Sequence, residues 1–239
     1  MSIHANPEPA SGNVTLTPLS RYVGPPLLVP AVGYAVAFIA SLALGGAMNA
    51  FATPSASAAD VVAHAAAHPT GIQFVSVLQL VAALALGVFT ATATSAIRSR
   101  GFDVASLQIA RFGGYTASTL LILSAVSGWC TVELAKISAG DAAKFASLLS
   151  FVTGGPAHVV TLGLLFAGVS VPVLLARLAP RWIAIFGLVL AGLAAVAALS
   201  LGISSIEYVL PVVRFPSMVW IIAIAATLLR PARSAVAHA

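Results

Sequence analysis

Three ionisable residues lie within or at the ends of long apolar stretches: Glu133, His158 and Arg214. An ionisable side chain costs free energy in hydrocarbon, so one found there is a candidate for function. Arg214 is suited to bind an anion or to pair with Glu133, and His158 is suited to exchange a proton near neutral pH. With the N-terminus cytoplasmic, all three lie in the outer half of the membrane. We therefore predict a polar pocket that opens outward and contains these residues.

Each of the three residues also has a structural explanation. Arg214 can extend its charged end to the outer lipid headgroups, and Glu133 can be an ordinary residue at the end of a span. His158 can hydrogen-bond a backbone carbonyl that Pro156, which lacks an N–H, leaves without its helical donor. Because the sequence does not orient one helix against another, both interpretations stay open for each residue.

A second set of polar residues, Asp60, His64 and His68, lies between the first two apolar stretches. Their spacing of four places them on one face of a helix, which Ser57 can cap and Pro69 can end. Two histidines at this spacing can ligate a metal, to which an aspartate adds an oxygen. The glutamate of an HExxH motif is missing, and the segment is rich in alanine. We expect an amphipathic helix without metal at the membrane surface, with the metal site as the weaker alternative.

No sequence motif assigns a reaction. The chain has no phosphate-binding Gly-rich loop, no GxSxG nucleophile motif and no pair of carboxylates within a span. Its single cysteine, Cys130, excludes an intrachain disulfide and a cysteine-based zinc site. We therefore expect no cofactor, and we favour a protein that is not an enzyme.

The composition requires lipid as a solvent. Charged residues make up 7% of the 239 residues, whereas an average soluble domain has about 25%. Apolar residues make up 60%. The net charge of +5 comes from basic residues scattered in ones and twos, and not from the continuous patch that is typical of nucleic-acid binding. We predict an integral membrane protein that has the lipid bilayer, and no nucleic acid, as its partner.

Six segments reach the length of about 20 apolar residues that a membrane-spanning helix needs. We predict an all-α, polytopic transmembrane helix bundle whose membrane domain covers residues 23–230. The predicted spans are residues 27–49, 71–97, 107–134, 157–176, 182–203 and 209–229. Interfacial helices are predicted over residues 57–68 and 141–153, and cytoplasmic tails over 1–22, which we expect to be disordered, and 231–239.

The fourth span is the least regular of the six. The apolar run over residues 145–175 is about 46 Å long as a helix, which is too long for an untilted crossing. Gly154, Gly155 and Pro156 lie inside this run and can break or kink a helix. We therefore interpret the residues before this break as a separate interfacial helix, and the sequence leaves open whether the two parts are continuous.

The positions of the basic residues predict the orientation, because lysine and arginine gather in the cytoplasmic loops of membrane proteins. With the N-terminus inside, eight basic residues are cytoplasmic and three are external. The inner ones are Arg21, Arg98, Arg100, Arg111, Arg177, Arg181, Arg230 and Arg233, and the outer ones are Lys136, Lys144 and Arg214. We predict that both termini are cytoplasmic and that the protein is a multi-pass protein of the plasma (inner) membrane.

Small residues recur at every fourth position in three spans. The series are Gly33, Ala37, Ser41 and Gly45; Ala83, Gly87, Ala91 and Ser95; and Gly187, Ala191 and Ala195. Such faces let helix backbones approach closely in lipid. They suit packing within the chain, a homo-oligomer or a membrane-protein partner.

The last third of the chain contains a series of distinctive short motifs: Gly154-Gly155-Pro156-Ala157-His158, Leu162-Gly163, Pro180-Arg181-Trp182-Ile183-Ala184, Gly187, Arg214-Phe215 and Trp220. In these residues the chain resembles a large family of uncharacterised bacterial multi-pass integral membrane proteins. The resemblance implies a bacterial membrane protein of this class. It implies no activity and no catalytic residues.

Taken together, these features favour a small-molecule or ion transporter, or a sensor, with an outward-facing polar pocket. The alternative is a non-catalytic membrane partner or assembly subunit that acts through helix–helix contacts. A membrane enzyme ranks third, because it depends only on Asp60, His64 and His68.

Overall fold

The computed structural model describes residues 26–202 and 209–228, and over these ranges the chain is all-α. Its α-helices are α1 (Leu28–Ala47), α2 (Ala58–Ala67), α3 (Pro69–Arg98), α4 (Ala105–Lys136), α5 (Gly140–Val152), α6 (His158–Leu175), α7 (Arg181–Ala197) and α8 (Val209–Leu228). A π-helical turn at Thr153–Ala157 joins α5 to α6, and a 3-10 turn at Ala198–Leu201 follows α7. The predicted fold class, an all-α helix bundle, is confirmed.

Six helical segments in the described ranges are long and apolar enough to cross a membrane. Five of them match the predicted spans to within a few residues at either end, and the fourth is longer than predicted. The chain is therefore a multi-pass membrane protein. The predicted tails, residues 1–22 and 231–239, lie outside the described residues.

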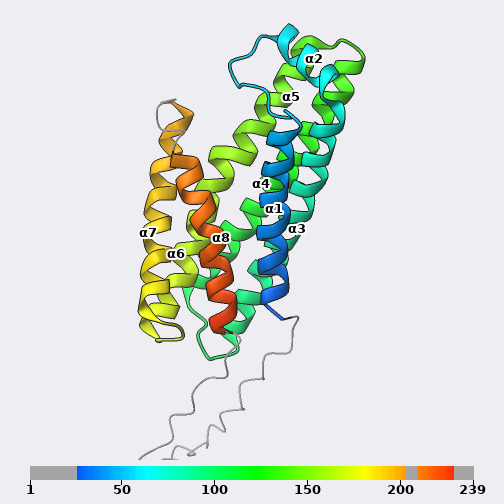
Figure 1. Cartoon of the computed structure of the whole chain (residues 1–239). Coiled ribbons are helices and arrows are strands. Elements are labelled where there is room, and N and C mark those ends of the chain that lie inside the picture. Colours follow the sequence, from blue (N-terminus) through cyan, green and yellow to red (C-terminus); the bar gives the residue numbers. More distant parts are fainter. Residues whose placement is uncertain (1–25, 203–208, 229–239) are drawn as a thin grey trace, which may run out of the picture.

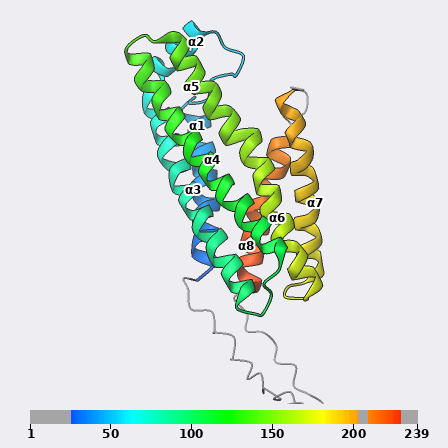
Figure 2. The ribbon, with the colours of Figure 1, turned by 180° about the vertical axis from the view of Figure 1, so that it is seen from behind.

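The helices form an elongated bundle in which α4 is central (Figures 1 and 2). Helix α4 packs against α3, α5 and α6, and α6 in turn packs against α7. Helix α2 and the start of α5 lie at one end of the bundle (Figure 1). The start of α1 and the end of α8 lie at the opposite end, as an even number of spans requires.

Small residues bring the helices into close contact inside the chain. A Cβ atom added to Gly113 of α4 would lie 2.5 Å from the Cβ of Leu164 in α6. A Cβ added to Gly187 of α7 would lie 2.2 Å from the hydroxyl of Ser170 in α6. Gly87 in α3 would meet the hydroxyl of Ser118 at 3.1 Å. Gly87 in α3 and Gly187 in α7, two of the small residues in the predicted series, therefore face neighbouring helices of the same chain.

Helix α2 begins with the cap that its sequence predicts. The hydroxyl of Ser57 accepts a hydrogen bond from the backbone N–H of Asp60, and the Asp60 carboxylate accepts one from the backbone N–H of Ser57. These reciprocal bonds satisfy two donors at the helix start. Pro69 follows α2 as expected, but it is also the first residue of α3, where its missing N–H costs no hydrogen bond.

The long fourth segment runs from Gly140 to Leu175 without leaving the bundle. Its first part, α5, matches the helix predicted before the break, and it continues along the bundle into α6 (Figure 2). Between them Gly155 has φ −97° and ψ −106°, which is not helical. The segment is thus one path with a kink at Gly155. The interfacial position predicted for residues 57–68 and 141–153 stays a prediction, because it concerns the membrane boundary.

Candidate functional site

The kink in the fourth segment changes the backbone hydrogen bonds around it. In a regular α-helix the N–H of His158 would donate to the carbonyl of Gly154. Here it donates to the carbonyl of Gly155 instead. The guanidinium of Arg214, in α8, donates through Nη2 to the carbonyl of Gly154. A side chain of α8 therefore bonds a carbonyl that the break has released from its regular helical donor.

Arg214 is partly buried, and its guanidinium contacts α1 as well as the kink. Its guanidinium carbon lies 5.1 Å from the centre of the Phe38 ring in α1, within the range of a cation–π contact. Its Nε atom is buried and has no hydrogen-bond partner. No carboxylate of the described residues lies within ion-pair distance of Arg214; Glu207, seven residues earlier in the chain, is outside the described residues. The guanidinium thus retains hydrogen-bonding capacity and positive charge.

His158 is fully buried between helices and has a partner for each ring nitrogen. Nδ1 lies 2.9 Å from the carbonyl oxygen of Ala117 in α4, and Nε2 lies 3.4 Å from the hydroxyl of Tyr34 in α1. Because a carbonyl oxygen only accepts, the proton is assigned to Nδ1, and Nε2 accepts from Tyr34. The ring also stacks on Phe38, with centroids 6.2 Å apart and planes at 8°. His158 does bond a carbonyl, but that carbonyl belongs to α4 and not to the break.

Glu133 lies apart from Arg214 and His158. Its carboxylate bonds the ammonium of Lys136 at 2.7 Å, one turn further along α4. The structure therefore places two of the three predicted pocket residues, Arg214 and His158, against the same Phe38 ring, and it places Glu133 in a surface ion pair.

A cavity of about 350 Å³ extends from Arg214 toward α2. It lies between the ends of α1 and α8 and the helices α2, α3, α4 and α5, with the π-helical turn as part of its floor. Its polar wall includes Ser76, Gln79, Ser124, Thr131, Ser147 and Ser150. Its apolar wall includes Leu42, Ile72, Val75, Phe151 and Leu210. Neither Glu133 nor His158 lines this cavity. Its volume lies within the range of about 300–1,000 Å³ that is usual for small-molecule sites.

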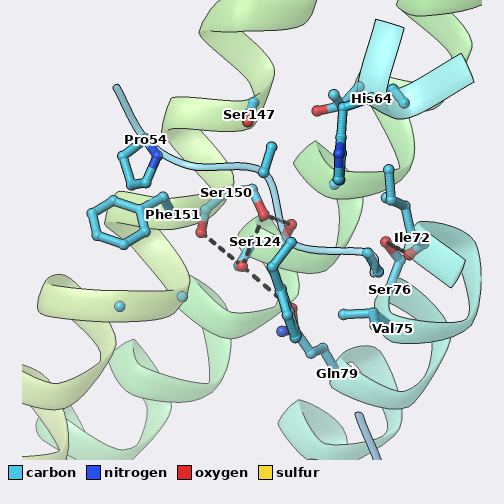
Figure 3. Close-up of a pocket in the computed structure, with 18 of the residues that line it drawn as sticks. Pro54, His64, Ile72, Val75, Ser76, Gln79, Ser124, Ser147, Ser150 and Phe151 are labelled. Atoms are coloured by element: carbon cyan, nitrogen blue, oxygen red, sulfur yellow. Dashed lines mark hydrogen bonds between the residues drawn. The ribbon is translucent and has the colours of Figure 1, made fainter. Parts of the chain in front are cut away.

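Ser124 lies at the centre of the polar wall, between Ser150 and Gln79 (Figure 3). Its hydroxyl donates to the carbonyl of Ser150 at 2.8 Å, and the hydroxyl of Ser150 donates to the carbonyl of Ser124 at 2.9 Å. The side-chain oxygen of Gln79 lies 3.4 Å from the Ser124 hydroxyl. These reciprocal bonds join α4 to α5 beside the kink.

The loop before α2, and α2 itself, also line the cavity. Lys144 of α5 donates from its ammonium to the carbonyl oxygens of Pro54 at 2.6 Å and Ala56 at 2.5 Å, and so joins α5 to this loop. Phe51, in the same loop, lines the cavity and is 47% exposed. His64 of α2 also lines the cavity, and its buried Nε2 has no hydrogen-bond partner (Figure 3).

The second set of predicted residues does not form a metal centre in this structure. The Asp60 carboxylate is bonded to Ser57, whose hydroxyl and backbone N–H lower the pKa of that carboxyl group. The rings of His64 and His68 have centroids 5.0 Å apart, and Nε2 of His68 lies 3.2 Å from the amide nitrogen of Asn49. Within residues 26–202 and 209–228, no group of three His, Cys, Asp or Glu side chains is arranged to hold a metal ion.

The hydroxyl of Ser124 has no histidine or carboxylate among its hydrogen-bond partners, so no base activates this serine as a nucleophile. Of the residues that line the cavity, Arg214 was predicted from the sequence, whereas Ser124 and Ser150 were not. The sequence shows that these two serines are polar residues within apolar spans. It does not show the direction in which their side chains point.

The chain matches no family model, no curated protein sequence and no solved structure. The resemblance of its last third to uncharacterised bacterial membrane proteins therefore stays a prediction.

Proposed function

We propose that the protein binds a small organic anion from the outer side of the membrane, as the recognition step of a transporter or a sensor. One observation carries this proposal. Arg214 is a partly buried cation at the floor of a cavity, with an unpartnered Nε and no carboxylate of the described residues within ion-pair distance. An anion in the cavity would supply the missing charge and the missing acceptor.

Electrostatics favours an anion over a cation or a neutral solute. Of the residues described as lining the cavity, Arg214 carries a permanent positive charge and none is acidic. Removal of a guanidinium from water without a counter-charge is costly. A carboxylate that accepts from the guanidinium offsets that cost, whereas a second cation would increase it.

The kink offers a route by which anion binding would change the arrangement of the helices. Arg214 connects α8 to the carbonyl of Gly154, in the middle of the discontinuous fourth segment. Broken helices line the binding sites of many transporters, where exposed backbone groups take part in binding. An anion that competes with the Gly154 carbonyl for the guanidinium would favour one arrangement of α8 against the kink over another. Both a transporter and a sensor need a ligand that favours one arrangement of the helices over another.

The alternative is a partner subunit that acts through helix contacts. Two of the small residues that motivate it, Gly87 in α3 and Gly187 in α7, contact helices of the same chain, whereas Ser95 and Ala195 of the same series are exposed. We retain the predicted orientation, with Arg98 and Arg177 on the cytoplasmic side of a bacterial plasma membrane, as part of this proposal. In that orientation the cavity opens to the exterior.

Calorimetric titration of hexanoate into the protein in lipid nanodiscs tests this proposal, with empty nanodiscs as the blank. We expect saturable binding that Arg214→Gln weakens by roughly tenfold or more, because a charge-assisted hydrogen bond contributes about 1.5–3 kcal/mol. Arg111→Gln is the matched control. Arg111 is also partly buried and bonds a hydroxyl, that of Thr94, but it does not line the cavity. Equal affinity in wild type and Arg214→Gln, or no binding at all, would overturn the proposal.

A further inference from the structure

Most hydroxyl groups of the cavity wall share one hydrogen-bonding pattern. Four of the five lining hydroxyls donate their hydrogen to a backbone carbonyl: Ser76 to Ile72, Ser124 to Ser150, Thr131 to Ser127 and Ser150 to Ser124, all at 2.8–2.9 Å. A hydroxyl has one hydrogen and two lone pairs. With the hydrogen engaged, each of these oxygens has only acceptor capacity left. These four hydroxyls therefore accept further hydrogen bonds and do not donate them, whereas the side-chain amide nitrogen of Gln79, in the same wall, is a donor.

The guanidinium of Arg214 and the acceptor hydroxyls of the wall come together at Gly154. The carbonyl of Gly154 accepts from Arg214, and a Cβ added to Gly154 would lie 2.3 Å from the hydroxyl oxygen of Ser124. Arg214 and Ser124 thus contact the same residue from α8 and from α4. A ligand whose negative group binds the guanidinium therefore has its neighbouring atoms beside acceptor oxygens. An unsubstituted alkyl carboxylate leaves those oxygens without a partner, which costs free energy at a buried site.

The remaining wall is apolar. The apolar residues that line the cavity include Leu42, Ile72, Val75, Phe151 and Leu210. Phe151 and Val75 lie on opposite sides of the Ser124–Ser150 pair (Figure 3). A hydrocarbon chain is the group that such a wall accommodates best, since its burial gains about 25 cal/mol for each Å² removed from water.

We propose that the ligand is a hydroxylated carboxylic acid with a short hydrocarbon chain, whose carboxylate binds Arg214 and whose hydroxyl donates to the oxygen of Ser124 or Ser150. This inference rests on the proposed function, because it assigns a ligand class to the same anion site. It adds a requirement that the anion site alone does not impose. The ligand must bring a hydrogen-bond donor close to its negative charge.

Three soluble acids test this requirement in nanodiscs: hexanoate, 3-hydroxyhexanoate and 3-methoxyhexanoate. The methoxy compound keeps the oxygen and loses the hydrogen. We expect 3-hydroxyhexanoate to bind about fivefold tighter than either of the others, the ratio that one neutral hydrogen bond supplies. In Ser124→Ala we expect this preference to fall to about twofold or less.

Ser118→Ala is the matched control. Ser118 lies on the same helix and donates across to the carbonyl of Ala83 at 2.7 Å, but it does not line the cavity. It should retain the full preference for the hydroxy acid. The comparison of the three acids on the wild-type protein needs no variant, so it remains decisive if Ser124→Ala fails to fold.

The outcomes separate the two proposals. Binding of all three acids with equal affinity, dependent on Arg214, would overturn the hydroxy-acid inference and leave the anion site in place. Tighter binding of the methoxy compound than of the hydroxy compound would also overturn the inference. Binding of none of the three acids would overturn both.

Discussion

Arg214 in α8 donates a hydrogen bond to the carbonyl of Gly154, sixty residues earlier, at the one place where the fourth segment departs from helical geometry. This hydrogen bond depends on both the charge of Arg214 and the released carbonyl of Gly154. The kink releases the carbonyl from its regular donor, and the carbonyl accepts a hydrogen bond from a guanidinium whose Nε has no hydrogen-bond partner. The site thus combines the kink in the fourth segment with the cation Arg214 of α8.

The space beside Gly154 gives a first prediction. A methyl group on Gly154 would lie 2.3 Å from the hydroxyl oxygen and 2.9 Å from the Cβ of Ser124. We expect Gly154→Ala to destabilise the protein by about 1–3 kcal/mol, the usual cost of overpacking, and to lower the unfolding temperature measured in detergent.

Gly192→Ala is the control for this substitution. Gly192 lies inside α7, and an added Cβ there meets no atom within 4 Å. Because alanine favours a helix over glycine by about 1 kcal/mol, this variant should be as stable as the wild type or more stable. An equal loss of stability in both variants would contradict the role of close packing at Gly154.

The buried histidine gives a second prediction. His158→Phe keeps an aromatic ring but leaves the Tyr34 hydroxyl and the Ala117 carbonyl without their partner. Each unpaired buried group costs about 1–3 kcal/mol. We expect a clear loss of thermal stability, and we expect Tyr34→Phe in the same protein to recover part of it, because it removes one of the unpaired groups. Strictly additive effects would show that the two side chains do not interact.

The loop before α2 gives a third prediction. Lys144→Met removes both hydrogen bonds from its ammonium to the carbonyls of Pro54 and Ala56. We expect amide hydrogen exchange over residues 50–57 to become roughly tenfold faster, since charged hydrogen bonds contribute about 1.5–3 kcal/mol. Lys136→Met, which removes only a surface pair with Glu133, should leave the exchange of this loop unchanged. Unchanged exchange in Lys144→Met would mean that other contacts hold the loop.

Metal content gives a fourth prediction. Asp60 is engaged with Ser57, and no cluster of three metal-ligating side chains exists within the described residues. We expect elemental analysis to find the same zinc content in the wild type and in the His64→Ala and His68→Ala double variant. A drop of about one zinc per chain in that variant would restore the metal site that the spacing of these residues suggested.

The sequence predicted the spans because their signal is local. Apolar length and the charged residues between spans are properties of each segment alone, and so is the cap at Ser57, which needs only Asp60 three residues later. The position of the break at Gly155 was predicted for the same reason, from glycine and proline within one run.

The site was predicted only in part, because its geometry depends on how helices are rotated against one another. Arg214 was identified from the cost of a charge within a span. Nothing local distinguishes Ser124, which faces the cavity, from Ser118, which faces α3. Glu133 was predicted close to Arg214 because both lie toward the outer side, but depth does not fix direction, and its carboxylate bonds Lys136.

The most direct measurement compares hexanoate with its neutral isostere, hexanamide, on wild-type protein and on Arg214→Gln. The central claim is that a single guanidinium selects for negative charge. It predicts that the wild type binds hexanoate roughly tenfold or more tightly than hexanamide. It predicts that Arg214→Gln binds the two compounds with nearly equal affinity, and that Arg111→Gln behaves as the wild type does. Retention of the full preference for hexanoate in Arg214→Gln would contradict the account.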